Sequence, residues 1–496
     1  MILRDLIKGV ETKRVLGSDD IEIPAICYDS KEVRDGSLFA AIRGEKTDGH
    51  KYVESAVKSG ARALLVEEIP ENPFRGVSII QVEDTKSALA EVSANFFNHP
   101  TKEITLVGVT GTNGKTTITY LLESIWQEWG KNTGVIGTID YRFSGKKIPS
   151  IRTTPESLDL MSLFRDMRDS AVQCVVMEVS SHALDRKRVF GCHFDAAVFT
   201  NLSQDHLDYH GTIENYFEAK KKLFSEVLGK SEKREKFSVI NIDDPYGKEI
   251  AKEAVGKIIS YSILNSEGVY AEKTDITPEG IHTILNTPWG KVEINSKLFG
   301  KHNLYNILAA VSTALSLGAE IGIVERGISK VVGVPGRLNR VENPFGITIL
   351  IDYAHTPDAL RNVLTAVRPF TRRKLILLFG CGGDRDPIKR PIMGRIGRDL
   401  SDILIVTSDN PRTENPDRII DQIEKGVLDG GSKEKLYFRI VDRYDAIRKA
   451  IEIAQEGDTV LIAGKGHESY QILGTEKIPF DDKEVAERII WGKMDA

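Results

Sequence analysis

The chain is poor in cysteine. Its four cysteines, Cys27, Cys174, Cys192 and Cys381, lie far apart, and no two of them form a C-x-x-C pair. This spacing excludes a scaffold of disulfide bonds and is typical of proteins in a reducing compartment.

Long apolar runs and a strong charge of one sign are also missing. No stretch approaches the roughly 18 apolar residues that a membrane-spanning helix needs. The opening residues, MILRDLIKGVETKRV, include acidic side chains and no sustained apolar core, so we expect no signal peptide. Lys and Arg total 67 against 72 Asp and Glu, a net charge of −5, which argues against wholesale binding of nucleic acid or membrane. We expect a cytoplasmic enzyme with neither partner.

The length and the pattern of apolar runs indicate a mixed α/β protein of about three domains. A chain of 496 residues is too long for one hydrophobic core at about 150 residues per domain. Short β-branched runs alternate with longer helical patterns, as in parallel α/β units. Helix-breaking clusters at 98–100 and 333–346 predict three domains. These domains span residues 1–100, 101–335 and 336–496.

Four apolar strands of the last third each run into a polar or glycine-rich turn. Ligands bind outside the carboxyl ends of strands in open parallel sheets, so these turns are expected to form a site. The four segments are ITILIDYAHTP from Ile347, LILLFGCGGDRD from Leu375, DILIVTSDNPR from Asp402 and DTVLIAGKGHE from Asp458.

A glycine-rich loop between a buried strand pattern, ITLVGVT, and a helical pattern, ITYLLESIWQEW, has the composition of a phosphate-binding loop. Glycines let backbone N–H groups face phosphate oxygens, the helix N-terminus adds a positive dipole end, and Lys115 adds a point charge. Thr116 is placed to offer its hydroxyl to Mg²⁺. Val109 stands where the common P-loop has a glycine, and a βα turn that only packs is the alternative to a triphosphate site. The loop residues are Gly111, Thr112, Asn113, Gly114, Lys115, Thr116 and Thr117.

Candidate metal ligands follow two later strand patterns. Glu178 ends the strand CVVME, where an acid beside a phosphate loop is the expected partner of Mg²⁺; capping of the next helix is the alternative. His206 and His210 are four residues apart, but no H-E-x-x-H motif or cysteine pair predicts a zinc site. By composition alone, the lysines at 220–222 indicate a solvated helix face.

Together these segments resemble the Mur ligase family, ATP-dependent amino-acid ligases of peptidoglycan precursor assembly. The match covers nearly the whole chain, and its motifs come in the same order. They are GTNGKTT at 111–117, RTTP from Arg152, MEVSSHAL from Met177, FTNLSQDHLDYHG from Phe199, EAKKKLF from Glu218, GKHNLYN from Gly300, PGRL from Pro335, DYAHTPDAL from Asp352, GCGGDRDPIKRP from Gly380, DNPR at 409–412 and AGKGHESYQ from Ala463.

The resemblance implies a fold and a reaction. The fold has an N-terminal uridine-nucleotide-binding α/β domain, a central P-loop-type ATPase domain with a mostly parallel sheet, and a C-terminal Rossmann-like domain. In the reaction, ATP phosphorylates the carboxylate of a UDP-N-acetylmuramoyl dipeptide. The amine of an amino acid then attacks the acyl phosphate, and phosphate leaves. ATP and Mg²⁺ are the implied cofactors, and we expect a monomer.

The resemblance also implies site residues. Lys115, His206 and Lys220 match catalytic positions, and Thr116, Glu178, His206 and Lys220 match metal positions. Lys220 would be carbamylated to ligate a second Mg²⁺, which leaves Lys221 and Lys222 on the surface. Asn303 has an alternative role as a helix N-cap. The remaining ATP-binding matches are His302, Asn303, Asn306, Arg337 and Asp352. The dipeptide-binding matches are Ser30, Glu45, Lys46, Thr47, Thr153, Thr154, Ser180, Arg188 and Arg186, which stands where the family often has Gln.

The DNPR segment predicts which amine is added. Meso-diaminopimelate carries a second carboxylate that lysine lacks, and an arginine binds a carboxylate through two parallel hydrogen bonds. Arg412 therefore predicts diaminopimelate, with a surface loop position as the alternative. The amine-binding matches are Asp409, Asn410, Pro411, Arg412, Arg390, Gly464 and Glu468, the last suited to an ammonium group.

Three other functions are alternatives to this reaction. Folylpolyglutamate synthesis predicts no domain before residue 100 and no DNPR segment. A GTPase-type switch requires an N-K-x-D segment, which the sequence lacks. A catalytically inactive homologue is disfavoured because Lys115, Glu178, His206 and Lys220 are all present.

Overall fold

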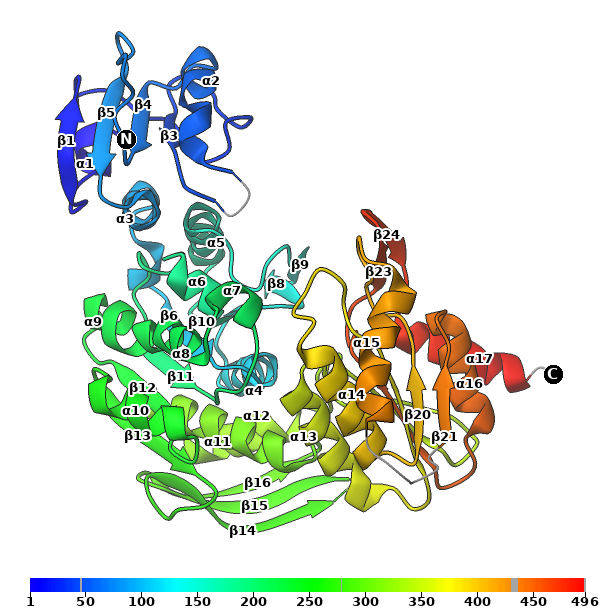
Figure 1. Ribbon diagram of the computed structural model, residues 1–496. Coiled ribbons are helices and arrows are strands. Elements are labelled where there is room, and N and C mark those ends of the chain that lie inside the picture. The colour runs from blue at the N-terminus through cyan, green and yellow to red at the C-terminus, as the bar shows by residue number, and fades with distance from the viewer. Residues whose placement is uncertain (45–46, 278, 430–435, 495–496) are drawn as a thin grey trace.

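The computed structural model describes residues 1–44, 47–277, 279–429 and 436–494, and its strands form three large sheets and one hairpin (Figure 1). The large sheets take their strands from 12–82, 105–296 and 339–463. The mixed α/β class and the mostly parallel central sheet are confirmed. The predicted domain limits at 100 and 335 fall between sheets and remain predictions.

The N-terminal sheet has the strand order β1-β5-β4-β3-β2, parallel except for β1. Alternate residues of β4 point to opposite faces, so Leu65 packs with α3 (Thr85–Phe96) and Leu64 with α2 (Val53–Lys58). The strands are β1 (Thr12–Leu16), β2 (Ile26–Cys27), β3 (Leu38–Ala40), β4 (Ala63–Val66) and β5 (Ser78–Val82).

The central sheet has eleven strands in the order β16-β15-β14-β13-β12-β11-β6-β10-β7-β8-β9. From β14 through β13, β12, β11, β6 and β10 to β7 neighbouring strands are parallel, and antiparallel hairpins extend both ends. The strands are β6 (Thr105–Thr110), β7 (Thr133–Ile136), β8 (Asp140–Phe143), β9 (Lys146–Pro149), β10 (Cys174–Glu178), β11 (Ala196–Phe199), β12 (Phe237–Asn241), β13 (Lys257–Ser262), β14 (Val269–Thr277), β15 (Gly280–Thr287) and β16 (Gly290–Ser296).

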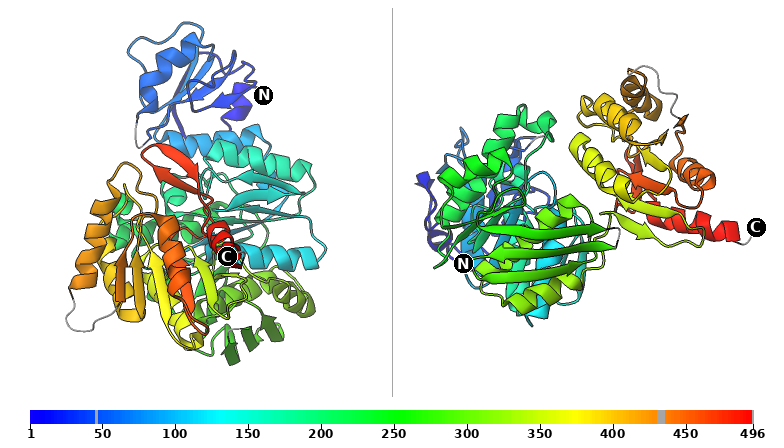
Figure 2. Two further views of the ribbon diagram at one scale, coloured as in Figure 1. Left: turned by 90° about the vertical axis from the view of Figure 1, so that its right-hand side faces the viewer. Right: turned by 90° about the horizontal axis from the view of Figure 1, so that it is seen from below.

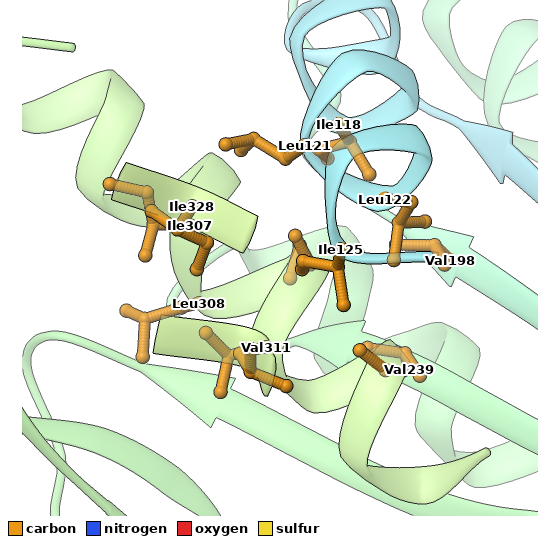
Figure 3. Close-up of a cluster of buried hydrophobic side chains, with 14 of the residues drawn as sticks. Ile118, Leu121, Leu122, Ile125, Val198, Val239, Ile307, Leu308, Val311 and Ile328 are labelled. Atoms are coloured by element: carbon orange, nitrogen blue, oxygen red, sulfur yellow. The ribbon is translucent and has the colours of Figure 1, made fainter. Parts of the chain in front are cut away.

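Helices cover both faces of the central sheet. On one face α4 (Lys115–Glu128) and α11 (Lys301–Ser316) bury their apolar sides against the sheet, as Figure 3 shows for Leu122, Ile125, Val198 and Val239. Helix α12 (Ile321–Ser329) packs against α4 and β16. The other face buries residues of α5 (Ser157–Asp169), α6 (Ser181–Asp185), α8 (Ile213–Lys222) and α10 (Pro245–Glu253). Short helices α7 (Leu207–His210) and α9 (Leu228–Lys230) flank α8.

The C-terminal sheet lies beside the central part (Figure 2) and has the order β17-β18-β22-β19-β20-β21, parallel except for β17. One face packs against α13 (Pro357–Val367), α14 (Lys389–Leu400) and α15 (Pro416–Leu428), and the other against α16 (Arg443–Ile453) and α17 (Asp482–Met494). The strands are β17 (Asn339–Val341), β18 (Thr348–Asp352), β19 (Leu375–Phe379), β20 (Ile403–Val406), β21 (Leu436–Arg439), β22 (Thr459–Ala463) and the hairpin β23 (Tyr470–Leu473) with β24 (Glu476–Pro479).

All four cysteines are buried and free. Within the described ranges, no helix has both the length and the apolar character that spanning a bilayer requires.

Candidate active site

The phosphate loop joins β6 to α4 through two glycines that no other residue replaces easily. Gly111 and Gly114 have φ of 141° and 92°, in the region that favours glycine. A Cβ on Gly111 would lie 1.8 Å from Thr200 Oγ1, and one on Gly114 would lie 2.3 Å from Asn306 Oδ1. The predicted strand, loop and helix are therefore present, and α4 begins at Lys115.

Two lysine amines converge on one carbonyl of this loop. Lys115 Nζ donates to the Gly111 carbonyl at 2.9 Å and to that of Thr112 at 2.8 Å, and Lys220 Nζ also donates to the Gly111 carbonyl at 2.9 Å. Burial lowers the pKa of Lys115, and Arg337 lowers it further, against the opposing effect of Glu178 and other acids. The loop thus holds the half-buried amine of Lys115 and the buried amine of Lys220 close together.

Lys220 is only 1% exposed, so the expectation from composition of a solvated lysine face is wrong for this residue. Its Nζ lies 4.6 Å from the centre of the Tyr216 ring. Burial and the nearby charge of Lys115 lower its pKa well below the ordinary value. Lys221 forms ion pairs with Glu218 and Glu253 instead, as expected for the outer face of α8.

Glu178 ends β10, which lies next to β6 in the sheet. Its Oε1 accepts hydrogen bonds from Thr116 Oγ1 at 3.0 Å and from the Thr138 N–H at 2.9 Å, and its Oε2 accepts one from Thr138 Oγ1 at 3.0 Å. Ser180, not Glu178, caps α6, so the capping alternative is wrong. A buried carboxylate and a hydroxyl, both hard oxygen donors, therefore meet at the start of α4.

His206 occupies a left-handed backbone position, with φ of 53°, at the start of α7. Its Nε2 lies 3.4 Å from Asp205 Oδ2. Burial lowers the pKa of His206 to about 4, in spite of Asp205. His210, in contrast, points to Ser181, with Nε2 3.0 Å from Oγ. No group of three or more His, Cys, Asp or Glu in the described ranges has the geometry of a metal site.

A cavity of about 690 Å³ opens beside the phosphate loop and brings together segments far apart in the sequence. The predicted nucleotide residues Asn113, Gly114, Thr117, His302, Asn303, Asn306, Arg337 and Asp352 all line it.

The start of α11 lines this cavity with three polar side chains. Asn306 Nδ2 donates to Asn303 Oδ1 at 3.0 Å, and Asn303 Nδ2 donates to the Phe299 carbonyl at 2.9 Å. The N-cap alternative for Asn303 is wrong, because Gly300 is the cap and Asn303 lies inside α11. Burial and Arg337 lower the pKa of His302 to about 4.

The C-terminal part contributes Arg337, Asp352 and Asp358 to the same cavity. Arg337 Nη2 lies 3.4 Å from Thr116 Oγ1. Asp352 accepts hydrogen bonds from the N–H groups of Leu338 and Ala354, and burial raises its pKa. Asp358, which is not among the predicted site residues, accepts a hydrogen bond from Asn113 Nδ2 at 3.2 Å and so joins the phosphate loop to α13.

The predicted sugar-dipeptide residues of the central part cluster beside Glu178. Thr154 Oγ1 donates to the Glu178 carbonyl at 2.9 Å and accepts a hydrogen bond from the Ser180 N–H at 3.1 Å. Arg188 donates to the Thr154 carbonyl at 3.1 Å, and Thr153 lies 3.1 Å from Thr138, oxygen to oxygen. Arg186 instead contacts Tyr209.

The predicted N-terminal contacts lie on loops of the first sheet. Ser30 follows β2, and Tyr28 in this loop donates to Asp159 Oδ2 of α5 at 2.6 Å, which brings the loop to the central part. Thr47 contacts Tyr52. Glu45 and Lys46 lie outside the described residues.

The amine-binding predictions form a second cluster at the carboxyl ends of β19, β20 and β22. Asn410 Nδ2 donates to Glu468 Oε2 at 2.7 Å, and Arg412 Nη1 donates to the Gly383 carbonyl at 2.7 Å. A Cβ on Gly464 would lie 2.7 Å from Asp409 Oδ2. None of these described residues lines the nucleotide cavity, so the two sites are built separately.

Two contacts in this amine cluster were not foreseen. Lys465 is fully buried, and its Nζ lies 3.0 Å from Glu468 Oε2 and 3.3 Å from Asn410 Oδ1. Arg390 is buried too, and it donates to both carboxylate oxygens of Glu414 at 2.8 Å. The lysine inside the GKGHE segment is the sequence feature from which the contact of Lys465 with Glu468 could have been predicted. Nothing in the local sequence pointed to the second.

Comparison with known proteins agrees with this architecture. Family models match residues 22–97 (Mur ligase family, catalytic domain), 109–314 (Mur ligase middle domain) and 336–466 (Mur ligase, glutamate ligase domain). The chain belongs to the Mur ligase family.

Curated relatives match almost the whole chain. UDP-N-acetylmuramoyl-L-alanyl-D-glutamate–2,6-diaminopimelate ligase from Geobacter metallireducens is 47% identical over 98% of this chain and 97% of its own length. The enzyme of the same name from Clostridium tetani is 44% identical over 99% of both chains. A solved structure with this name has a TM-score of 0.71 and 31% identity, covering 100% of this chain and 99% of its own. Mycobacterium tuberculosis folylpolyglutamate synthase shares the fold over 76% of this chain and 92% of its own, at 19% identity and a TM-score of 0.62.

Proposed function

We propose that the chain is an ATP-dependent ligase that adds meso-diaminopimelate to UDP-N-acetylmuramoyl-L-alanyl-D-glutamate in peptidoglycan precursor synthesis, acting as a monomer. The names of the relatives that match the full chain support this reaction. The structural observation that carries it is the convergence of Lys115 and Lys220 on the Gly111 carbonyl. The Lys115 amine contacts carbonyl oxygens, which carry no net charge, so its ammonium group is available to the terminal phosphates of ATP, and Lys220 lies beside it.

The first step is phosphoryl transfer. The acceptor carboxylate attacks the terminal phosphorus of ATP, the bond to the ADP oxygen breaks, and an acyl phosphate forms. Lys115 and the N–H groups of the phosphate loop neutralise and orient the transferring group, which is the main task of a protein in this chemistry. His302, Asn306 and Arg337 hold the nucleoside part in the adjoining cavity.

The second step is acyl transfer to the amine. The amine nitrogen attacks the acyl carbon and loses a proton to solvent, an amide bond forms, and phosphate leaves with the bonding electrons. Thr153, Thr154, Ser180 and Arg188 hold the dipeptide end of the acceptor beside Glu178, with Arg186 at the margin of the site. Loops at Ser30 and Thr47 hold the uridine end.

The donors at the start of α4 fit Mg²⁺, because a hydroxyl and a carboxylate lie 3.0 Å apart there and Mg²⁺ prefers oxygen ligands completed by phosphates. Thr116 and Glu178 would hold it. When bound, Mg²⁺ neutralises charge on the phosphate oxygens. His206 would serve a second cation together with a modified Lys220.

Lys220 has the properties that carbamylation requires. Its lowered pKa favours the neutral amine, whose nitrogen attacks the carbon of CO₂; an N–C bond forms and the displaced proton passes to solvent. The product is an anionic oxygen donor in place of an ammonium. Mass spectrometry of the native protein should show one added CO₂, and Lys220→Ala should abolish turnover while the fold remains intact.

The amine-selectivity assay tests the proposed reaction. Purified protein with ATP and the UDP-linked dipeptide should incorporate meso-diaminopimelate and reject L-lysine, since Arg412 would be left without a carboxylate partner. Steady turnover of ATP to ADP should require the acceptor together with an amine nucleophile. Equal incorporation of L-lysine would contradict the proposed amine, and ADP release without acceptor would contradict the reaction.

A further inference from the structure

A fully buried ion pair lies behind the amine cluster, formed by two residues that no motif described above contains. Arg443 begins α16, and Asp482 begins α17. Both side chains are 0% exposed, and the guanidinium donates two hydrogen bonds of 2.7 Å to the two carboxylate oxygens. The helices pack against the same face of the C-terminal sheet (Figure 1).

The remaining donors of Arg443 reach two different strand ends. Nη1 donates to the Ser408 carbonyl at 3.2 Å, and Nη2 donates to the Ala463 carbonyl at 3.1 Å. Ser408 directly precedes the DNPR segment, and Ala463 directly precedes Gly464 and Lys465. The strands concerned, β20 and β22, are not neighbours, because β19 lies between them. One guanidinium therefore joins two loops that the sheet's own ladder does not connect directly.

The charge of Arg443 also faces the amine cluster. Burial opposes the charged form, but Asp482, followed by Asp409 and Glu468, keeps the pKa of Arg443 above its ordinary value. Asp482 lies in the first turn of α17, where the helix dipole favours a negative charge. The guanidinium is thus a permanent cation behind Asp409 and Glu468.

We infer that Arg443, held by Asp482, is a positioning residue that sets the spacing of the DNPR and GKGHE loops and so determines affinity for the incoming amino acid. This inference rests on the proposed function. A planar guanidinium serves this purpose because its donors have fixed directions. A lysine has one point charge and cannot hold two carbonyls and a carboxylate in one plane.

The test compares Arg443→Lys with Arg439→Lys. Arg439 is a suitable control because it also forms ion pairs, with Asp417, Asp421 and Glu424, but it contacts α15 and neither loop. For Arg443→Lys we expect KM for meso-diaminopimelate to rise about 10- to 100-fold, since small misplacements of binding groups have effects of this size. KM for ATP and for the dipeptide should change less than about twofold, as should all constants of Arg439→Lys.

A partial reaction separates this role from a general loss of folding. Acyl-phosphate formation, trapped with hydroxylamine in the absence of amino acid, should proceed in Arg443→Lys at the wild-type rate. Asp482→Asn, which keeps the guanidinium contacts to both carbonyls, should raise the amine KM less than Arg443→Lys does. If the wild type itself incorporates no diaminopimelate, the proposed function fails. The inference is overturned if the wild type incorporates diaminopimelate and Arg443→Lys has an unchanged KM for diaminopimelate. It is also overturned if Arg443→Lys raises KM for all three substrates to the same extent, or if Arg443→Lys and Asp482→Asn are both unfolded.

Discussion

The two halves of the site hold their lysine and arginine side chains with different partners. At the phosphate loop, the amines of Lys115 and Lys220 contact carbonyl oxygens of the loop. In the amine cluster, Lys465 pairs with Glu468, Arg390 with Glu414 and Arg443 with Asp482. At the phosphate loop the lysine amines therefore contact uncharged carbonyl groups, whereas three buried cations of the amine cluster are each paired with a carboxylate. Arg412, by contrast, donates to the Gly383 carbonyl.

The largest expected effect is at the phosphate loop. Lys115→Ala removes the charge that stabilises the transferring phosphoryl group, and kcat should fall about 10³-fold or more. Steady-state kinetics measures this loss. The control is Lys131→Ala, beyond the other end of α4 against Trp129, which should leave kcat unchanged. A loss below tenfold for Lys115→Ala would contradict the assigned role of Lys115 in phosphoryl transfer.

The next effect concerns stability in the amine cluster. Lys465→Met leaves the carboxylate of Glu468 without its buried partner, and removing one member of such a pair costs about 3 kcal/mol. Chemical denaturation should show this decrease in the free energy of unfolding. Lys477→Met is the matched control, because Lys477 stacks on the same Tyr470 ring but is exposed. Equal stability of the two variants would argue against a preformed, ion-paired cluster.

A smaller effect tests the backbone of the phosphate loop. Gly111→Ala places a Cβ 1.8 Å from Thr200 Oγ1 and keeps an unfavourable φ, so it should cost about 2 kcal/mol. Gly130→Ala has a similarly positive φ of 72° but open space around the Cβ, and should cost about 1 kcal/mol. Thermal unfolding of the two variants separates the close contact from backbone strain. The same melting temperature for both would show that Thr200 moves away freely.

The smallest expected effect is a gain in stability, not a loss. The pKa of Lys220 is lower in the folded protein than in the unfolded chain, so the unfolded state binds the proton more tightly. Stability is therefore reduced below the folded pKa and recovers as the pH rises toward the ordinary value. Lys220→Met should raise the unfolding free energy at pH 7 by about 1 kcal/mol, although turnover is lost.

The pH dependence of the unfolding free energy provides the control for this expected gain in stability. The stability advantage of Lys220→Met should shrink as the pH rises from neutrality toward about 10.4, the pKa of an unperturbed lysine. Lys221→Met, on the outer face of the same helix, should show no such trend. A Lys220→Met variant less stable than the wild type at pH 7 would mean that an additional group compensates the buried charge.

The sequence was most informative where function depends on contiguous residues. The phosphate loop follows from seven adjacent residues between a strand and a helix, because its ligands are backbone groups whose directions the glycines set locally. The position of Glu178 could be predicted for a similar reason, because this residue directly ends an apolar strand pattern. The role of Asn303 as a cap was wrong because the helix begins two residues earlier, at Lys301, and helix ends are set by a few competing residues.

Contacts between distant segments were not readable in this way. Burial of Lys220 but not Lys221 depends on which face of α8 meets the phosphate loop, 109 residues away. The contact of Asp358 with Asn113 spans 245 residues, and that of Lys465 with Asn410 spans 55. Adjacent lysines have nearly the same local propensity, so composition alone assigned them one environment.

The mixed α/β class, the phosphate loop and the motifs that mark the family could be predicted from the amino-acid sequence, because these depend on local periodicity and on short runs of adjacent residues. The three-dimensional packing sets which lysine and arginine side chains contact carbonyl oxygens and which pair with carboxylates. Burial and pairing depend on where separate strands and helices come together, and no local pattern encodes that meeting.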